Sequence, residues 1–281
     1  MKKWNLIIDV EKGVDFINAV LSAKDEYVGN EHPGYSAPVA VESSDIITIE
    51  RKVRGETPVV DAVNVLRMCN HCDDAPCMKA GGDAVTKRDD GIVIIDPEKA
   101  KGRRDIVDAC PYDAIVWNEE LQLPQSWIFD AHLLDQGWEN PRCIAACAAG
   151  GIEVVKITDD EMQKRVADEQ LEVIDPELDT KPRVYYRNLY RYNTALVGGT
   201  VTSESDAVEE CVEGATATLI VQGSEESVVE TDVFGEFRFD RVAPNIGPCE
   251  IKIACDGFAT QSLSVDVQDS TNVGVVRLER L

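Results

Sequence analysis

Four cysteines in the first half of the chain have the spacing needed to hold a metal centre. Cys69 and Cys72 stand three positions apart, Cys77 follows five positions later, and the more distant Cys110 precedes a proline. Iron–sulfur clusters are held by cysteine thiolates, and a Cys-Pro pair is a familiar source of a ferredoxin ligand. Together these four thiols would complete one [4Fe–4S] site.

Two other interpretations of these cysteines stay open from the spacing alone. Zinc also accepts four cysteines, or three cysteines and a histidine such as His71. Free cysteines can also serve simply as small buried hydrophobic residues. His71 lies inside the ligand loop, where it could hydrogen-bond to a centre or be an ordinary loop residue.

The charge balance excludes several classes of partner. The chain has 281 residues, with 52 acidic and 28 basic side chains and a formal net charge of −24. Binding to phosphate requires a basic face, so we expect no nucleic-acid partner and no anionic membrane surface. The first apolar run is too short for a signal peptide, and none reaches the roughly 18 residues of a membrane span. We therefore expect a cytoplasmic protein, where clustered thiols stay reduced and usually bind metal.

The elements around the cysteines can be predicted in outline. A strand over residues 6–10 and a helix over 11–24 open the chain, and a hairpin over residues 85–95 turns at Asp90-Gly91. Asp96-Pro97 offers a helix start, which predicts a helix from 98 to about 107, just before Cys110. Thr158 and Glu161 have capping-box spacing, so a further helix should run to about residue 169.

The chain changes character toward its end. Residues 181–192 interleave aromatic and basic side chains, which in so acidic a chain favours a packed or subunit-facing arm over nucleic-acid stacking. From residue 195 onward, short β-branched runs separated by turns predict a small β-sandwich. Its cysteines, Cys211, Cys249 and Cys255, are expected to be free thiols. We expect a domain over 1–157, a helix and interface arm over 158–194, and a β domain over 195–281.

Several motifs together resemble a known family. They are Cys69-Asn-His-Cys72 with Ala-Pro-Cys77, the stretch from Gly91 to Asp96-Pro, Cys110-Pro-Tyr-Asp-Ala-Ile, Ala131-His-Leu-Leu, Pro141-Arg-Cys143 with Cys147, and Lys181-Pro-Arg-Val-Tyr-Tyr. The chain resembles the iron–sulfur subunits of molybdopterin oxidoreductases, and most closely the small subunits of pyrogallol–phloroglucinol transhydroxylases. Those small subunits also end in a β-sandwich, so the resemblance covers nearly the whole chain.

The resemblance implies a fold, a partner and cofactors. The fold would be α+β, with two interlocked ferredoxin-like units followed by a carboxypeptidase-regulatory or Cna-B-like β-sandwich. A large catalytic subunit would carry the molybdopterin cofactor and the active site, forming a heterodimer in an anaerobic setting. The transhydroxylase small subunit carries three [4Fe–4S] clusters, which need twelve cysteines, whereas this chain has nine in total.

The resemblance also shows where ligands are missing. One family cluster would need positions 13, 16, 19 and 147, and a second would need 127, 130, 143 and 23. These positions hold Gly13, Phe16, Ala19, Cys147, Trp127, Asp130, Cys143 and Ala23. Only the set of Cys69, Cys72, Cys77 and Cys110 is complete, so we expect one [4Fe–4S] cluster. Cys143 and Cys147 would be orphaned thiols, with Asp130 a conceivable oxygen ligand, and the larger substitutes would fill the vacated volume.

Three functions are compatible with this pattern. Moving a hydroxyl between two phenols exchanges no net electrons with outside carriers, so a chain of clusters is dispensable. The missing ligands therefore favour a non-catalytic small subunit of a transhydroxylase-like complex acting on phenolic compounds. The alternatives are an electron-transfer subunit of a molybdopterin reductase or dehydrogenase, and a purely structural subunit.

Overall fold

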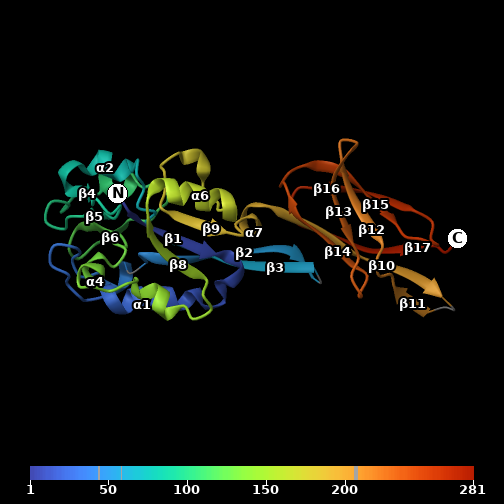
Figure 1. Ribbon diagram of the computed structural model, residues 1–281, viewed down its shortest axis with the longest axis horizontal. Coiled ribbons are helices and arrows are strands. Elements are labelled where there is room, and N and C mark those ends of the chain that lie inside the picture. Colours follow the sequence, from blue (N-terminus) through green and yellow to red (C-terminus); the bar gives the residue numbers. More distant parts are fainter. Residues whose placement is uncertain (44, 58, 206–207) are drawn as a thin grey trace. The chain divides into compact units, whose positions relative to one another are not determined.

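The computed structural model describes residues 1–43, 45–57, 59–205 and 208–281. The fold mixes helices with a larger share of sheet, as Figure 1 shows. It divides into two compact units, which are described separately. The first combines Met1–Arg51 with Asn64–Leu189, and the second combines Lys52–Val63 with Tyr190–Leu281.

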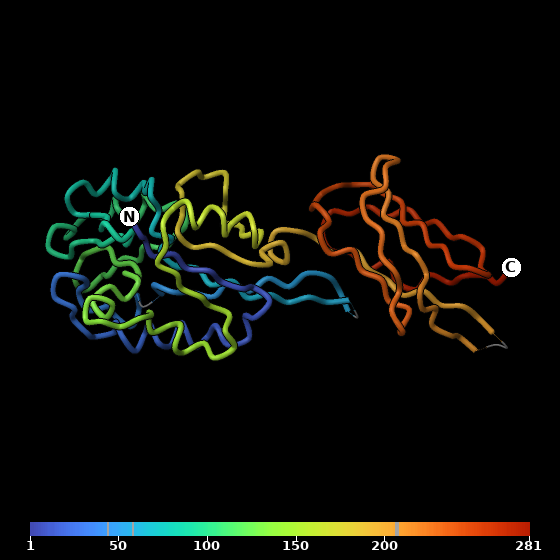
Figure 2. Tube along the Cα trace, viewed as in Figure 1, coloured from blue at the N-terminus to red at the C-terminus, as the bar shows by residue number. Residues whose placement is uncertain are grey.

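A three-stranded sheet forms the centre of the first unit. Strand β1 (Lys3–Asp9) pairs antiparallel with β8 (Ile152–Ile157) and parallel with β9 (Val184–Arg187). Figure 2 shows these three segments, far apart in sequence, running side by side. Leu6, Ile7 and Ile8 are fully buried because β1 is the middle strand. The segment that we expected to be an arm thus supplies β9 to this sheet.

The helices of the first unit follow the predicted starts in two of three cases. The opening helix is present as η1 (Val10–Asp15) and α1 (Phe16–Tyr27). Helix α6 (Asp159–Glu169) begins at the predicted capping box, in which the Glu161 N–H donates to Thr158 Oγ1. The helix predicted from residue 98 is wrong: residues 97–102 form turns, and only α3 (Asp105–Asp108) is helical. Gly102 adopts φ +76°, a left-handed conformation that interrupts a right-handed helix.

Short elements complete the first unit. The predicted hairpin is present, with β4 (Val85–Lys87) antiparallel to β5 (Val93–Ile95). The other elements of this unit in order are η2 (Val41–Ser43), α2 (Pro76–Gly81), η3 (Gly82–Ala84), β6 (Val116–Asn118), β7 (Leu123–Gln125), α4 (Ala131–Asp135), α5 (Arg142–Ala146) and η4 (Pro176–Leu178). Strands β2 (Ile47–Glu56) and β3 (Val59–Met68) are divided between the two units, since Lys52–Val63 belongs to the second. Strands β2 and β3 pair with each other, as do β6 and β7.

The second unit contains α7 (Tyr190–Asn193) and two four-stranded sheets. One sheet joins β10 (Ala195–Ser205) to β11 (Val208–Cys211), β14 (Glu236–Val242) and β17 (Thr271–Leu278). The other has the order β13 (Ser224–Glu230), β12 (Thr216–Val221), β15 (Gly247–Ala254) and β16 (Gln261–Val267). Leu219, Phe239 and Ile251 come from both sheets and share one buried core. Short strands are predicted after residue 195, and the structure contains them as β10 to β17.

A buried ion pair lies in the second unit. Arg54 is only 2 % exposed, and its Nη2 lies 2.7 Å from Asp61 Oδ2 and 2.8 Å from Asp240 Oδ1. Burial raises the pKa of Asp61, but hydrogen bonds from Arg191 and Arg54 outweigh it and bring that pKa to about 2. The carboxylate is therefore charged at neutral pH and balances the buried guanidinium.

Across the described ranges of the chain, none of the helices is both long and apolar enough to cross a membrane.

Candidate metal centre

The four predicted ligand cysteines line one cavity of the first unit. Cys69 and Cys72 lie in the loop after β3, Cys77 is the second residue of α2, and Cys110 follows α3. All four are free thiols. The short hairpin β4–β5 contributes Val93 to the same cavity. Segments more than thirty residues apart in sequence therefore bring four sulfur atoms to one place.

Burial makes these thiols poor acids on their own. It raises the pKa of Cys69 well above its ordinary value and that of Cys77 to about 11, and it also raises the pKa of Cys72 and Cys110. Neighbouring thiolates raise the values for Cys69, Cys72 and Cys77 further by mutual repulsion. A cationic centre would reverse this balance, since metal coordination deprotonates thiols. Four converging sulfur donors thus fit an iron–sulfur cluster, which takes thiolates as its ligands.

The loop between Cys69 and Cys72 is held in a left-handed turn. His71 adopts φ +46° and is 1 % exposed, and its Nδ1 accepts a hydrogen bond from the Val93 N–H at 3.1 Å. Burial lowers the pKa of His71 to about 3, so the imidazole is neutral. Lys87 Nζ donates to the carbonyl oxygens of His71 and Cys72 at 2.7 and 2.9 Å. These bonds fix the backbone that presents the first two cysteines.

Two basic residues that the sequence analysis missed hold the next residue, Asp73. Lys87 Nζ lies 2.9 Å and Arg183 Nε 2.8 Å from Asp73 Oδ1. Burial raises the pKa of Asp73, but hydrogen bonds from Arg183 and Lys87 outweigh it and leave that pKa below its usual value. Arg183 stands beside the parallel strand β9, so only the long-range sheet pairing could have revealed its contact with Asp73.

The positions of one incomplete ligand set are filled by a hydrogen-bonded cluster. Ala23, Trp127 and Cys143 are all buried. Asp130 Oδ1 accepts from Tyr27 Oη at 2.5 Å and from Trp127 Nε1 at 2.9 Å, while Oδ2 accepts from the Arg142 N–H at 2.7 Å. Both carboxylate oxygens are thus already occupied by protein donors. Among the four positions of this set, 23, 127, 130 and 143, only the last holds a cysteine.

The other incomplete ligand set, at positions 13, 16, 19 and 147, is filled by the aromatic ring of Phe16. Phe16 and Ala19 are fully buried, and a Cβ added at Gly151 would lie 2.8 Å from the Phe16 ring. Cys147 is also buried, and its Sγ donates to the Asp15 carbonyl oxygen at 3.6 Å. A Cβ added at Gly13 would lie 3.1 Å from the same Phe16 ring, and Gly13 is buried too. No second group of four sulfur donors forms from these eight positions, all of which lie within the described part of the chain.

Comparison with known proteins identifies a domain and a full-length relative. Residues 60–157 match the model of a 4Fe-4S dicluster domain, which supports iron–sulfur cluster binding by this chain. The chain is 41% identical over 281 residues to the pyrogallol hydroxytransferase small subunit of Pelobacter acidigallici, covering 99% of this chain and 100% of that one.

Other relatives match the chain over part of its length. It is 36% identical over 138 residues to one of the subunits of tetrathionate reductase from Salmonella typhimurium, covering 46% of this chain and 54% of that protein. It is 31% identical over 137 residues to the beta subunit of perchlorate reductase from Dechloromonas aromatica, covering 47% and 41%. Among solved structures, the shaft pilin SpaA from Lactobacillus rhamnosus GG aligns over 100% of this chain and 98% of that one, at 10% identity and a TM-score of 0.28, too low to support a conclusion.

The full-length identity and the domain match agree with the motifs around the four cysteines. Relatives from several enzymes are the small or beta iron–sulfur subunits of molybdoenzyme complexes, which implies a large catalytic partner. The chain belongs to the family of iron–sulfur small subunits of molybdopterin oxidoreductases.

Proposed function

We propose that the chain is the non-catalytic small subunit of a molybdopterin-dependent, transhydroxylase-like complex that acts on phenolic compounds. The observation that carries this proposal is the 41% identity to the pyrogallol hydroxytransferase small subunit over the full length of both chains. The large partner would bind the molybdopterin cofactor and the substrate and would contain the active site. The two subunits would form a heterodimer in the cytoplasm.

Within this complex the chain would hold one [4Fe–4S] cluster on Cys69, Cys72, Cys77 and Cys110. Support comes from the four free thiols around one cavity and from the absence of a comparable sulfur set among the eight positions described above. When bound, such a cluster supplies one-electron transfer. The chain's own residues would keep water away by burial and hold the loop through Lys87 and Asp73.

We extend the proposal to the architecture. Residues 1–157 would form two interlocked ferredoxin-like units with degenerate ligand motifs, and residues 158–194 would form a helix and an interface arm. Residues 195–281 would form a β-sandwich of the Cna-B-like kind, supported by the two sheets that share one core.

Metal analysis tests the cluster assignment. Anaerobically purified protein should contain about four irons and about four inorganic sulfides per chain. About twelve irons per chain would overturn the ligand assignment. Zinc found in place of iron would show that the four cysteines form a structural zinc site instead.

A second function is favoured by the partial matches to subunits of tetrathionate and perchlorate reductases. In that case the cluster would relay electrons between the large subunit and an external carrier. Freeze-quenching the complex during turnover and recording electron paramagnetic resonance separates the two functions. A cluster that is reduced and reoxidised at the turnover rate would favour electron transfer, whereas a spectroscopically silent cluster during phenol transhydroxylation would favour our first proposal.

A further inference from the structure

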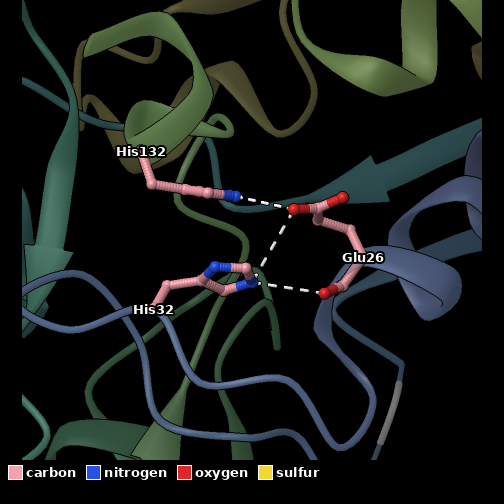
Figure 3. Close-up of side chains that lie close together, drawn as sticks. All are labelled: Glu26, His32 and His132. Atoms are coloured by element: carbon pink, nitrogen blue, oxygen red, sulfur yellow. Dashed lines mark hydrogen bonds and ion pairs between the residues drawn. The ribbon is translucent and has the colours of Figure 1, made fainter. Parts of the chain in front are cut away.

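Three side chains away from the cysteine site converge in the first unit. Glu26 lies near the end of α1, His32 lies in the loop that follows, and His132 is the second residue of α4. Figure 3 shows both imidazoles turned toward the Glu26 carboxylate. His132 Nε2 lies 2.8 Å and His32 Nε2 3.8 Å from Glu26 Oε1, and the three potential ligand atoms lie within 4.8 Å of one another.

Neighbouring groups hold these side chains in place. The Tyr27 ring lies edge-on to both imidazoles, with centroid distances of 5.4 Å to His32 and 5.8 Å to His132. Arg142 donates to the second carboxylate oxygen of Glu26, which leaves Oε1 facing the histidines. The contacts with His132 and Arg142 fix the Glu26 carboxylate between an imidazole and a guanidinium.

The two imidazole rings lie against each other. Their ring centroids are 3.9 Å apart and the rings are inclined by 30°. A neutral imidazole offers a nitrogen lone pair, which is the donor that transition metals take from histidine. The Glu26 backbone oxygen, 3.2 Å from His32 Nε2, adds a fourth donor atom.

We propose that Glu26, His32 and His132 bind one divalent transition-metal ion of the zinc class, at a site separate from the four cysteines. Two imidazole nitrogens and one carboxylate oxygen form a ligand set that zinc accepts, with water or the Glu26 carbonyl completing the coordination. Metal ions that prefer thiolate ligands would not select this site, because it contains no sulfur. The ion would join the end of α1, the following loop and α4.

Metal stoichiometry of the full chain tests the site. The protein is purified with its iron, treated with EDTA, incubated with Zn²⁺ and desalted before zinc and iron are measured. Wild-type protein should retain about one zinc per chain, and His32→Gln or His132→Gln should retain less than about one tenth of that zinc with unchanged iron. Glu31→Gln is the matched control, because Glu31 is exposed in the same loop and its substitution removes one charge outside the site.

Cobalt distinguishes this site from the thiols. Co²⁺ bound by nitrogen and oxygen lacks the intense sulfur-to-cobalt charge-transfer band, and its visible spectrum should persist in Cys110→Ser and disappear in His32→Gln. A thiolate band that vanishes in Cys110→Ser, or zinc retention insensitive to both histidine variants, would overturn the proposal. Failure to bind zinc leaves the iron count untouched, so the proposed function is tested separately.

A stability measurement guards against misfolding of the histidine variants. His32 is partly exposed, so His32→Gln should fold. Zn²⁺ should raise the Tm of wild-type protein and of Glu31→Gln but leave the Tm of His32→Gln unchanged, since a ligand that binds only the folded state stabilises it. An equal rise in all three proteins would contradict binding at these residues.

Discussion

Two buried regions of the first unit, the cysteine cavity and the cluster around Asp130, treat their polar groups in opposite ways. Around the cavity, Cys69, Cys72, Cys77 and Cys110 present sulfur and have raised pKa values, so the thiols stay protonated unless a cation binds them. Around Asp130, aromatic rings and hydrogen bonds fill the volume and leave both carboxylate oxygens paired. A region built to hold a cofactor leaves donors unsatisfied, whereas a region that has no cofactor must satisfy them itself.

The largest effect should come from removing a sulfur, and it should separate the two regions completely. Cys110→Ser takes away one of the four donors, so we expect most of the roughly four irons per chain to be lost, measured by iron and sulfide content after anaerobic purification. Cys143→Ser is the matched control, because Cys143 is buried in the Asp130 region. Equal iron loss in the two variants would erase the distinction between the regions.

The next effect concerns the Trp127 side chain, which fills the Asp130 region. Trp127 is fully buried and stacks on Phe129 at a centroid distance of 4.9 Å. Trp127→Ala should lower the free energy of unfolding by about 3–5 kcal/mol through the cavity it leaves. Urea unfolding measures this, and Trp138→Ala, at a site 47% exposed, should change it by less than about 1 kcal/mol. If Trp127→Ala left the free energy of unfolding nearly unchanged, the space around Trp127 would not be tightly packed.

A smaller change tests the hydrogen bonds rather than the volume. Tyr27→Phe removes the hydroxyl that donates to Asp130 at 2.5 Å while keeping the ring. We expect the free energy of unfolding to fall by about 1–3 kcal/mol, because a buried acceptor loses a partner. Tyr35→Phe is the control: its hydroxyl donates to Asp135 in an exposed pair, so the loss should be much smaller. Equal losses would show that burial adds nothing to the Tyr27 bond.

The smallest effect is a pH dependence next to the cysteine loop. The pKa of Asp73 is below its usual value, so its contribution to stability is present above the unfolded pKa of about 3.9 and is lost as pH falls through the lower folded value. Asp73→Asn should therefore cost about 1 kcal/mol at pH 7 and progressively less in acid, measured by unfolding between pH 7 and pH 3. Asp89→Asn removes the same charge at an exposed position, and its effect on the free energy of unfolding should not change with pH in this way.

The local parts of this molecule could be predicted from its sequence and the long-range parts could not. The hairpin ending at Ile95 and the capping box at Thr158 follow from neighbouring residues, and the structure contains both. The helix expected from residue 98 failed because one glycine, Gly102, takes a left-handed conformation that spacing does not reveal.

The candidate sites show the same limit. The four cysteines could be grouped by spacing and family motifs, and the ligand assignment itself stays a prediction. The pairing of Arg183 with Asp73 joins residues 110 positions apart, and His132 meets Glu26 across 106 positions. Contacts of that span depend on the sheet and on helix placement, which no local pattern encodes.

The position of β1 in the middle of its sheet bears on how the protein is made. Residues 3–9 leave the ribosome long before their partner strands, which both lie beyond residue 151, and β9 ends only at Arg187. At about 5–20 residues per second, this apolar strand waits on the order of 10–40 s for its second neighbour. During that time it is an unpaired edge, so slowed translation or a shortage of chaperones should send nascent chains toward aggregation before any cofactor is inserted.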